Sequence, residues 1–194
     1  MKSTPLLSLV SLSATALAAG CNVEGNLFQL QAFQTRDDGS RRTGSVQVAQ
    51  IGDLGTETLA HFSASSAGGP ETSTAVFYLN TDNNRLIVLD PFGLLHASNS
   101  YTDAAEGGEL KFTFYNDTSR PEPYHWPVFG ISEADDGEYL TVDGDAAAFK
   151  HCPTDAESSL LTGSIALGTA DVGKDCVPLD GLKIYPVTSQ ISQE

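Results

Sequence analysis

The feature that most constrains the fold is a series of short segments, spread along the whole chain, in which apolar and polar residues alternate. Alternation places every second side chain on one face, as in a β-strand with one buried side. Gly, Asp, Asn and Pro bound these segments, and those residues favour turns. The segments that we expect to form strands are 28–33, 44–51, 74–79, 85–89, 110–115, 139–142, 159–167 and 182–187.

Three stretches of turn-forming residues punctuate this series. Residues 80–84 (Asn-Thr-Asp-Asn-Asn) lie between two apolar runs, which is a pattern typical of a β-hairpin. Asp37-Asp38-Gly39 and Asp143-Gly144-Asp145 predict two further turns. In the second expected strand, the alternation places Val46 and Val48 on the same face.

Helical periodicity is nearly absent from the sequence. No amphipathic segment separates the expected strands, so the crossovers that parallel strands require are missing. Helix is expected only in short turns, such as the one around 91–96. A chain of 194 residues is long enough to bury one core. We therefore predict a single all-β domain, an antiparallel β-sandwich or barrel, over residues 19–188, followed by a flexible tail at 189–194.

The first 18 residues have the pattern of a secretory signal peptide. Lys2 supplies the positive start, residues 5–12 form an apolar stretch, and Ala16-Leu17-Ala18 fits the small-x-small cleavage rule. A membrane helix is disfavoured, because the apolar run is short and interrupted by Ser and Thr. We expect a secreted protein that has no membrane partner after cleavage.

A second interpretation of this region is a lipoprotein anchor. Leu17-Ala18-Ala19-Gly20-Cys21 resembles a bacterial lipobox, in which the cysteine is acylated. The bulky residue expected three places before the cysteine is displaced by one position, and Ala18 stands in its place. We favour the cleaved signal peptide.

The charge of the chain excludes one class of partner. With 10 Lys and Arg against 25 Asp and Glu, the formal net charge is −15. Nucleic acids and anionic membranes are attracted by clusters of cations, and this chain has the opposite balance. No nucleic-acid partner is expected.

The chain has three cysteines, Cys21, Cys152 and Cys176. In an oxidising compartment cysteines tend to pair, and three cannot all pair within one chain. Cys152 and Cys176 both lie in the C-terminal quarter beside Pro-bearing turns, so we expect these two to form a disulfide. The alternative is three free thiols.

One N-glycosylation sequon is present, at Asn116-Asp117-Thr118. It precedes the Pro-rich stretch 119–123, which we expect to be an exposed loop. A eukaryotic secretory route would place a glycan on Asn116, whereas a chance triplet is the alternative.

Sequence motifs for catalysis and cofactor binding are scarce. His61, His96, His125 and His151 match no metal-ligand spacing, and no G-x-S-x-G motif marks a nucleophilic serine. We therefore expect no metal, no cofactor and no enzymatic activity. A pair of carboxylates acting as acid and base is the remaining enzymatic possibility.

The densest acidic stretch is Asp135-Asp136 together with Asp143 and Asp145, on either side of one expected strand. Oxygen ligands of this kind could hold calcium weakly, although the spacing is not that of an EF-hand. A solvated acidic surface is the favoured interpretation.

The single tryptophan lies in the segment Tyr124-His125-Trp126-Pro127. Trp126 and Tyr124 are candidates for carbohydrate contact, because a flat aromatic face can stack on a sugar ring. The alternative, which we favour, is that Trp126 is a core anchor that pins a loop.

The chain resembles the PhiA family of secreted fungal cell-wall proteins associated with phialides and conidia. The resembling segments are the central hairpin at 74–79 and 86–89, Phe149-Lys150-His151-Cys152-Pro153, and Gly173-Lys174-Asp175-Cys176, within a looser match over 26–187. The resemblance implies a non-enzymatic, glycosylated wall protein with a role in asexual spore-forming structures and in stress protection. Its partners would be wall polysaccharide or wall proteins.

Two other functions stay open at this point. One is a secreted carbohydrate-active enzyme that uses paired carboxylates. The other is a secreted effector or allergen-like protein that binds a host protein, because many such proteins share a disulfide-closed β-fold.

Overall fold

The computed structural model describes residues 27–51, 57–62, 75–89, 97–113, 124–153, 161–169 and 175–187. These ranges contain fourteen strands and no helix, so the all-β prediction is confirmed. No helix within them has the length and hydropathy needed to cross a membrane. The strands are β1 (Phe28–Thr35), β2 (Arg41–Ile51), β3 (Glu57–Phe62), β4 (Val76–Asn80), β5 (Arg85–Leu89), β6 (Ala97–Tyr101), β7 (Gly107–Glu109), β8 (Lys111–Thr113), β9 (Phe129–Ala134), β10 (Gly137–Val142), β11 (Phe149–Pro153), β12 (Gly163–Gly168), β13 (Val177–Pro178) and β14 (Gly181–Pro186).

Seven of the strands close a barrel. The ring runs β1-β2-β3-β8-β6-β5-β4 and back to β1, and every pairing in it is antiparallel. The last step, between β4 and β1, rests on the single residue pair Phe28–Phe77. Closing a sheet in this way removes its exposed edges, which would otherwise pair with other chains.

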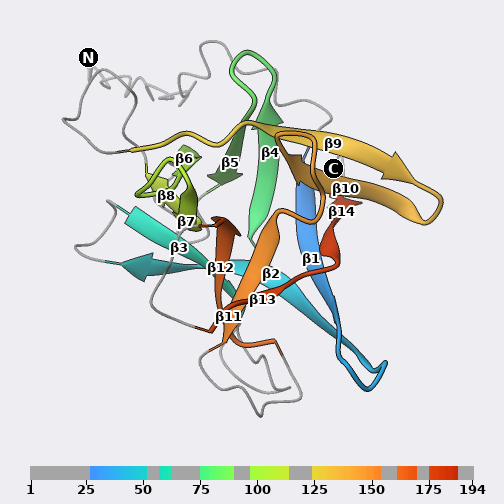
Figure 1. The fold of residues 1–194 in the computed structure, drawn as a ribbon. Coiled ribbons are helices and arrows are strands. Elements are labelled where there is room, and N and C mark those ends of the chain that lie inside the picture. The colour runs from blue at the N-terminus through green and yellow to red at the C-terminus, as the bar shows by residue number, and fades with distance from the viewer. Residues whose placement is uncertain are drawn as a thin grey trace, which may run out of the picture.

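Two groups of strands extend the sheet beyond the barrel (Figure 1). β14 pairs with β1 over residues 28–33, β10 pairs with β14, and β9 pairs with β10. We call β14, β10 and β9 the wing. On the other side, β12 pairs with the end of β3. β11 and β7 pair with β12, and β13 pairs with β11. Figure 1 shows β9 and β10 as a hairpin that projects from one side of the molecule.

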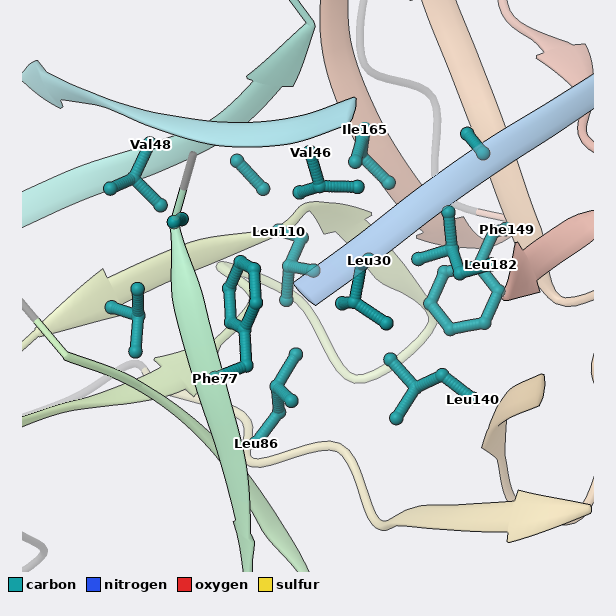
Figure 2. Close-up of a cluster of buried hydrophobic side chains, with 14 of the residues drawn as sticks. Leu30, Val46, Val48, Phe77, Leu86, Leu110, Leu140, Phe149, Ile165 and Leu182 are labelled. Atoms are coloured by element: carbon teal, nitrogen blue, oxygen red, sulfur yellow. The ribbon is translucent and has the colours of Figure 1, made fainter. Parts of the chain in front are cut away.

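One hydrophobic cluster joins the barrel to both extensions. Figure 2 shows Leu30 and Phe77 of the barrel in the same cluster as Leu140 and Leu182 of the wing and Phe149 of β11. All five are fully or almost fully buried. Since burying a large apolar side chain stabilises a fold by about 1.5–3 kcal/mol, the extensions share their stability with the barrel.

Each of the eight expected strands overlaps an observed one, although their bounds differ. The second strand begins at Arg41 rather than 44, and the third covers Val76–Asn80 rather than 74–79. Val46 and Val48 are both buried, as the alternation predicted. The sequence did not indicate β3, β6, β7, β9, β11 or β13.

The three expected turns are confirmed by their backbone geometry. Asn84 adopts a left-handed conformation (φ 55°), and its N–H donates to the carbonyl of Asn80 at 2.8 Å. Gly39 and Gly144 also have positive φ, at 78° and 84°. Short polar residues and glycine tolerate this region, which explains why the turn composition was informative.

The disulfide between Cys152 and Cys176 is present, as predicted. Cys152 is buried on β11, and Cys176 directly precedes β13, so the bond fastens the short β13 to its neighbour. Several other predictions lie outside the described residues. They are the signal peptide at 1–18, Cys21, the helical turn at 91–96, Asn116 and the tail at 189–194.

Candidate functional site

Three aromatic rings and one guanidinium form a cluster on the barrel surface, which we call the aromatic cluster: Arg85, Tyr101, Tyr124 and Trp126. The Tyr124 and Trp126 rings stack with centroids 5.9 Å apart and planes 29° apart. Tyr101 packs edge-on against both, at 4.3 Å and 6.3 Å. The guanidinium of Arg85 lies 4.1 Å from the centroid of the Trp126 ring, in cation–π geometry.

Backbone hydrogen bonds hold the segment that carries Tyr124 and Trp126. His125 and Thr102 exchange two N–H···O bonds, at 2.9 and 3.0 Å, directly after β6. Further along, the N–H of Phe129 donates to the carbonyl of Asn84 at 2.8 Å, in the turn between β4 and β5. The rings are therefore fixed from both sides of the segment.

Trp126 is half-buried and packs against Tyr101, which is only 1% exposed. It is therefore not the core residue that we favoured, although it packs against a buried ring, and its contact with carbohydrate stays a prediction. It lies outside the main hydrophobic cluster, and Tyr124 is likewise half-buried. Both residues are therefore partly accessible to solvent.

A cleft with a volume of about 380 Å³ opens between the barrel and the wing. Its walls come from four places: the start of β1, the β4–β5 turn, the β9–β10 hairpin and the end of β14. The lining residues are Leu27, Phe28, Leu79, Thr81, Asn84, Phe129, Gly130, Ile131, Glu138, Ile184 and Pro186. The wall is predominantly apolar, as in most sites for small ligands.

The cleft and the aromatic cluster are neighbours. Asn84 lines the cleft, and the next residue, Arg85, belongs to the aromatic cluster. On the segment that leads into β9, Trp126 belongs to the cluster and Phe129 lines the cleft. The bond from Phe129 to Asn84 runs along the boundary between the two.

Asp136 is bound in a local network at the tip of the β9–β10 hairpin. Lys183 of β14 forms an ion pair with it at 3.0 Å and also donates to its backbone carbonyl. The Tyr139 hydroxyl donates to the same carboxylate at 2.9 Å. The Lys183 bond and then the Tyr139 bond hold the pKa of Asp136 below its ordinary value. The carboxylate fastens the hairpin to β14.

The four aspartates of the acidic stretch do not form one site, so the geometry does not support the calcium site that was the disfavoured alternative. Asp135 and Asp136 precede β10, whereas Asp143 and Asp145 follow it. A strand of this length separates its two ends by roughly 20 Å. Two carboxylates that act together on a glycosidic bond stand roughly 5–10 Å apart. All four residues are exposed, in agreement with the solvated surface that we favoured.

No metal-binding cluster is found where the chain is described: no three His, Cys, Asp or Glu side chains there lie close enough to hold an ion. The histidines fall in different places. His151 is buried on β11, His125 lies in the surface segment beside Trp126, and His96 lies outside the described ranges.

His151 should make folding stability depend on pH. Burial lowers its pKa below the ordinary 6.5, while its Nε2 lies 2.8 Å from the carbonyl oxygen of Thr162. The unfolded chain therefore takes up a proton before the folded chain does, and stability falls as the pH drops below about 6.5. The slope contributed by His151 is at most about 1.4 kcal/mol per pH unit.

Denaturant unfolding of wild type and His151→Gln between pH 8 and pH 5 measures this effect. The difference in unfolding free energy between the two proteins should be constant near pH 8 and shift in favour of the variant as the pH falls. A difference that stays constant down to pH 5 would contradict the assignment.

Comparison with known proteins adds no family: no family model, no curated protein and no solved structure matches the chain. The resemblance to the PhiA family therefore stays a prediction.

Proposed function

We propose that this protein is a secreted, non-enzymatic component of the fungal cell wall that binds wall polysaccharide or a glycosylated wall protein through the aromatic cluster. The observation that carries the proposal is the stacked pair of Tyr124 and Trp126, held half-buried on the surface. Roles in asexual spore-forming structures and in stress protection form part of the same proposal, and rest on the resemblance to the PhiA family.

The chemistry of the cluster suits a sugar. Pyranose rings have apolar C–H faces that stack on aromatic rings, and hydroxyl groups that need hydrogen-bond partners. Tyr124 and Trp126 offer aromatic surface next to the guanidinium of Arg85, which lies over the Trp126 ring, and the Tyr124 hydroxyl and the Trp126 indole N–H supply polar atoms. Because the backbone around the rings is hydrogen-bonded, little ordering is needed when a ligand binds.

The disulfide and the closed barrel support an extracellular setting. A structural disulfide persists in oxidising compartments, and a barrel leaves few strand edges at which proteins aggregate. Both features suit a protein that remains folded in a wall matrix for a long time.

Retention on insoluble chitin, β-glucan and mannan tests the proposal. Trp126→Ala should weaken retention on the polysaccharide that binds by at least about fivefold, because central aromatic contacts are worth more than about 1 kcal/mol. Trp126→Phe should keep most of the binding. The matched control is Tyr185→Ala, which removes an aromatic residue 42% exposed on β14, outside the cluster.

Two results would count against this function. Wild-type protein that is retained on none of the polysaccharides, and that captures no wall glycoprotein, would remove the binding role. Protein found in the culture medium and absent from wall extracts would favour the effector alternative.

One observation favours the enzymatic alternative. Glu133 of β9 and Glu138 of β10 stand directly opposite each other in the hairpin register. Cross-strand neighbours have Cβ atoms roughly 5 Å apart, so their carboxylates can come as close as those of a retaining glycosidase. If wild-type protein cleaves a wall polysaccharide and both Glu133→Gln and Glu138→Gln abolish the cleavage, this alternative replaces the proposal.

A further inference from the structure

We propose that the cleft between the barrel and the wing binds a small amphipathic amine, with the apolar part in the cleft and the ammonium group beside Glu138. This site is separate from the aromatic cluster, and it takes a different class of ligand from the polysaccharide proposed above.

The apolar part of the ligand is indicated by the walls of the cleft. Phe28, Phe129 and Ile184 form buried surface at its base, and Leu79 is half-buried beside them. Ile131 is 47% exposed at the rim, although it stands opposite the buried Leu140. The volume of about 380 Å³ is in the range of clefts that hold small organic ligands. An alkyl chain or a ring would remove this surface from water.

The charge of the ligand is indicated by the one ionisable residue of the wall. Glu138 is the only acid among the lining residues, and none of them is basic. Glu133 lies opposite Glu138 in the register, so a second carboxylate stands at the same end of the hairpin. Like charges in directly opposed positions repel each other, and a cation placed between them relieves that repulsion.

The two cations on segments that line the cleft are engaged elsewhere: the guanidinium of Arg85 lies over the Trp126 ring, and Lys183 is bound to Asp136. Lys183 pairs with Tyr139 in the β10–β14 register, one position along from Glu138, and so it points to the opposite face of the sheet. Its ammonium group is bound to Asp136. An anionic headgroup in the cleft would meet Glu138 without a compensating positive charge, and the net charge of −15 would add to the repulsion.

Thr81 and Asn84 complete the polar part of the rim. Their side chains can accept hydrogen bonds from the remaining N–H groups of an ammonium. The lining therefore offers one negatively charged acceptor and two neutral acceptors.

The test compares three ligands of equal chain length, octylamine, 1-octanol and octanoate, by NMR titration of the full-length protein at neutral pH. Octylamine should bind saturably, with shifts centred on residues of β9, β10 and β14. It should bind roughly fivefold more tightly than 1-octanol, as expected for a charge pair near the surface. Octanoate should bind most weakly.

Two substitutions separate the roles of charge and apolar surface. Glu138→Gln should remove the advantage of octylamine over 1-octanol, whereas Ile131→Ser should weaken all three ligands together. The matched controls are Glu106→Gln, an exposed glutamate away from the cleft, and Val177→Ser, an apolar residue 41% exposed on β13. Both controls should bind as wild type does.

The assignment is overturned by any of three results. The first is that none of the three ligands binds saturably. The second is that octanoate binds as tightly as octylamine, and the third is that Glu138→Gln keeps the preference for the amine. The retention of Trp126→Ala on polysaccharide is measured separately, so the failure of one site is distinguishable from the failure of the other.

Discussion

Replacing Cys152 and Cys176 together by serine should lower the free energy of unfolding by about 3.5 kcal/mol. The two cysteines are 24 positions apart, and the bond between them restricts the unfolded chain to a closed loop. On the chain-entropy account, removing the cross-link raises the conformational entropy of the unfolded chain, and for a loop of this length the gain corresponds to the stated free energy. Equilibrium urea unfolding of wild type and the double variant measures the difference.

The same change should release β13 locally. β13 pairs with β11 at two residues only, and Val177 and Pro178 are exposed. On the N-terminal side the disulfide at Cys176 holds it, whereas on the C-terminal side it is held by the buried Leu179, whose N–H donates to the carbonyl of Phe149. Amide hydrogen exchange at Val177 should accelerate more than exchange in β1 or β5. Cys21→Ser serves as the control. If it destabilises the protein as much as the double variant does, the stabilising bond is not the one between Cys152 and Cys176.

Phe77→Ala should lower the free energy of unfolding by about 3–5 kcal/mol. Phe77 is fully buried on β4, and its ring lies between those of Phe28 and Phe112, with centroids 6.4 and 6.0 Å away. These three rings connect β1, β4 and β8 across the barrel. Truncation removes the middle ring and leaves a cavity that the rigid strands cannot close.

Thermal unfolding gives a second measure of this substitution. For a domain of this size, a loss of about 4 kcal/mol corresponds to a fall in Tm of roughly 10 °C. Phe77→Leu keeps much of the volume and should cost less than half as much. Tyr185→Ala, at a position 42% exposed, should change Tm little. Equal effects at positions 77 and 185 would show that Phe77 is not part of the core.

Local sequence pattern predicted the strands that have one buried and one exposed face. In β1 the alternation is visible, and β5 is a continuous apolar run directly after the turn at 80–84, so both strands were located. β7 consists of Gly107-Gly108-Glu109 and has no such pattern. It exists because its backbone approaches β12 closely: a Cβ on Gly107 would stand 2.1 Å from the carbonyl oxygen of Leu167. Such an approach depends on a partner 60 residues away, and the local sequence does not reveal it.

In the candidate site, too, some residues could be predicted from the local sequence and others depend on the fold. Tyr124 and Trp126 were singled out because aromatic residues in a Pro-bounded segment are informative by type alone. Arg85, Tyr101 and Glu138 were missed, since each belongs to an ordinary strand and gains its role from neighbours brought by the fold. The cleft combines the start of β1, a hairpin turn and the end of β14, and no local signal connects those segments.

The pairing of β1 with β14 has a consequence for biogenesis. These strands stand side by side over six residue pairs, although about 150 positions separate them in the chain. β1 also supplies the residue that closes the barrel, and its pairing with β14 requires a segment that is synthesised about 150 residues later. High contact order of this kind slows folding, and it leaves β1 without this partner until β14 has been synthesised. Truncations that remove residues 181–187 should therefore accumulate as degradation-prone intermediates.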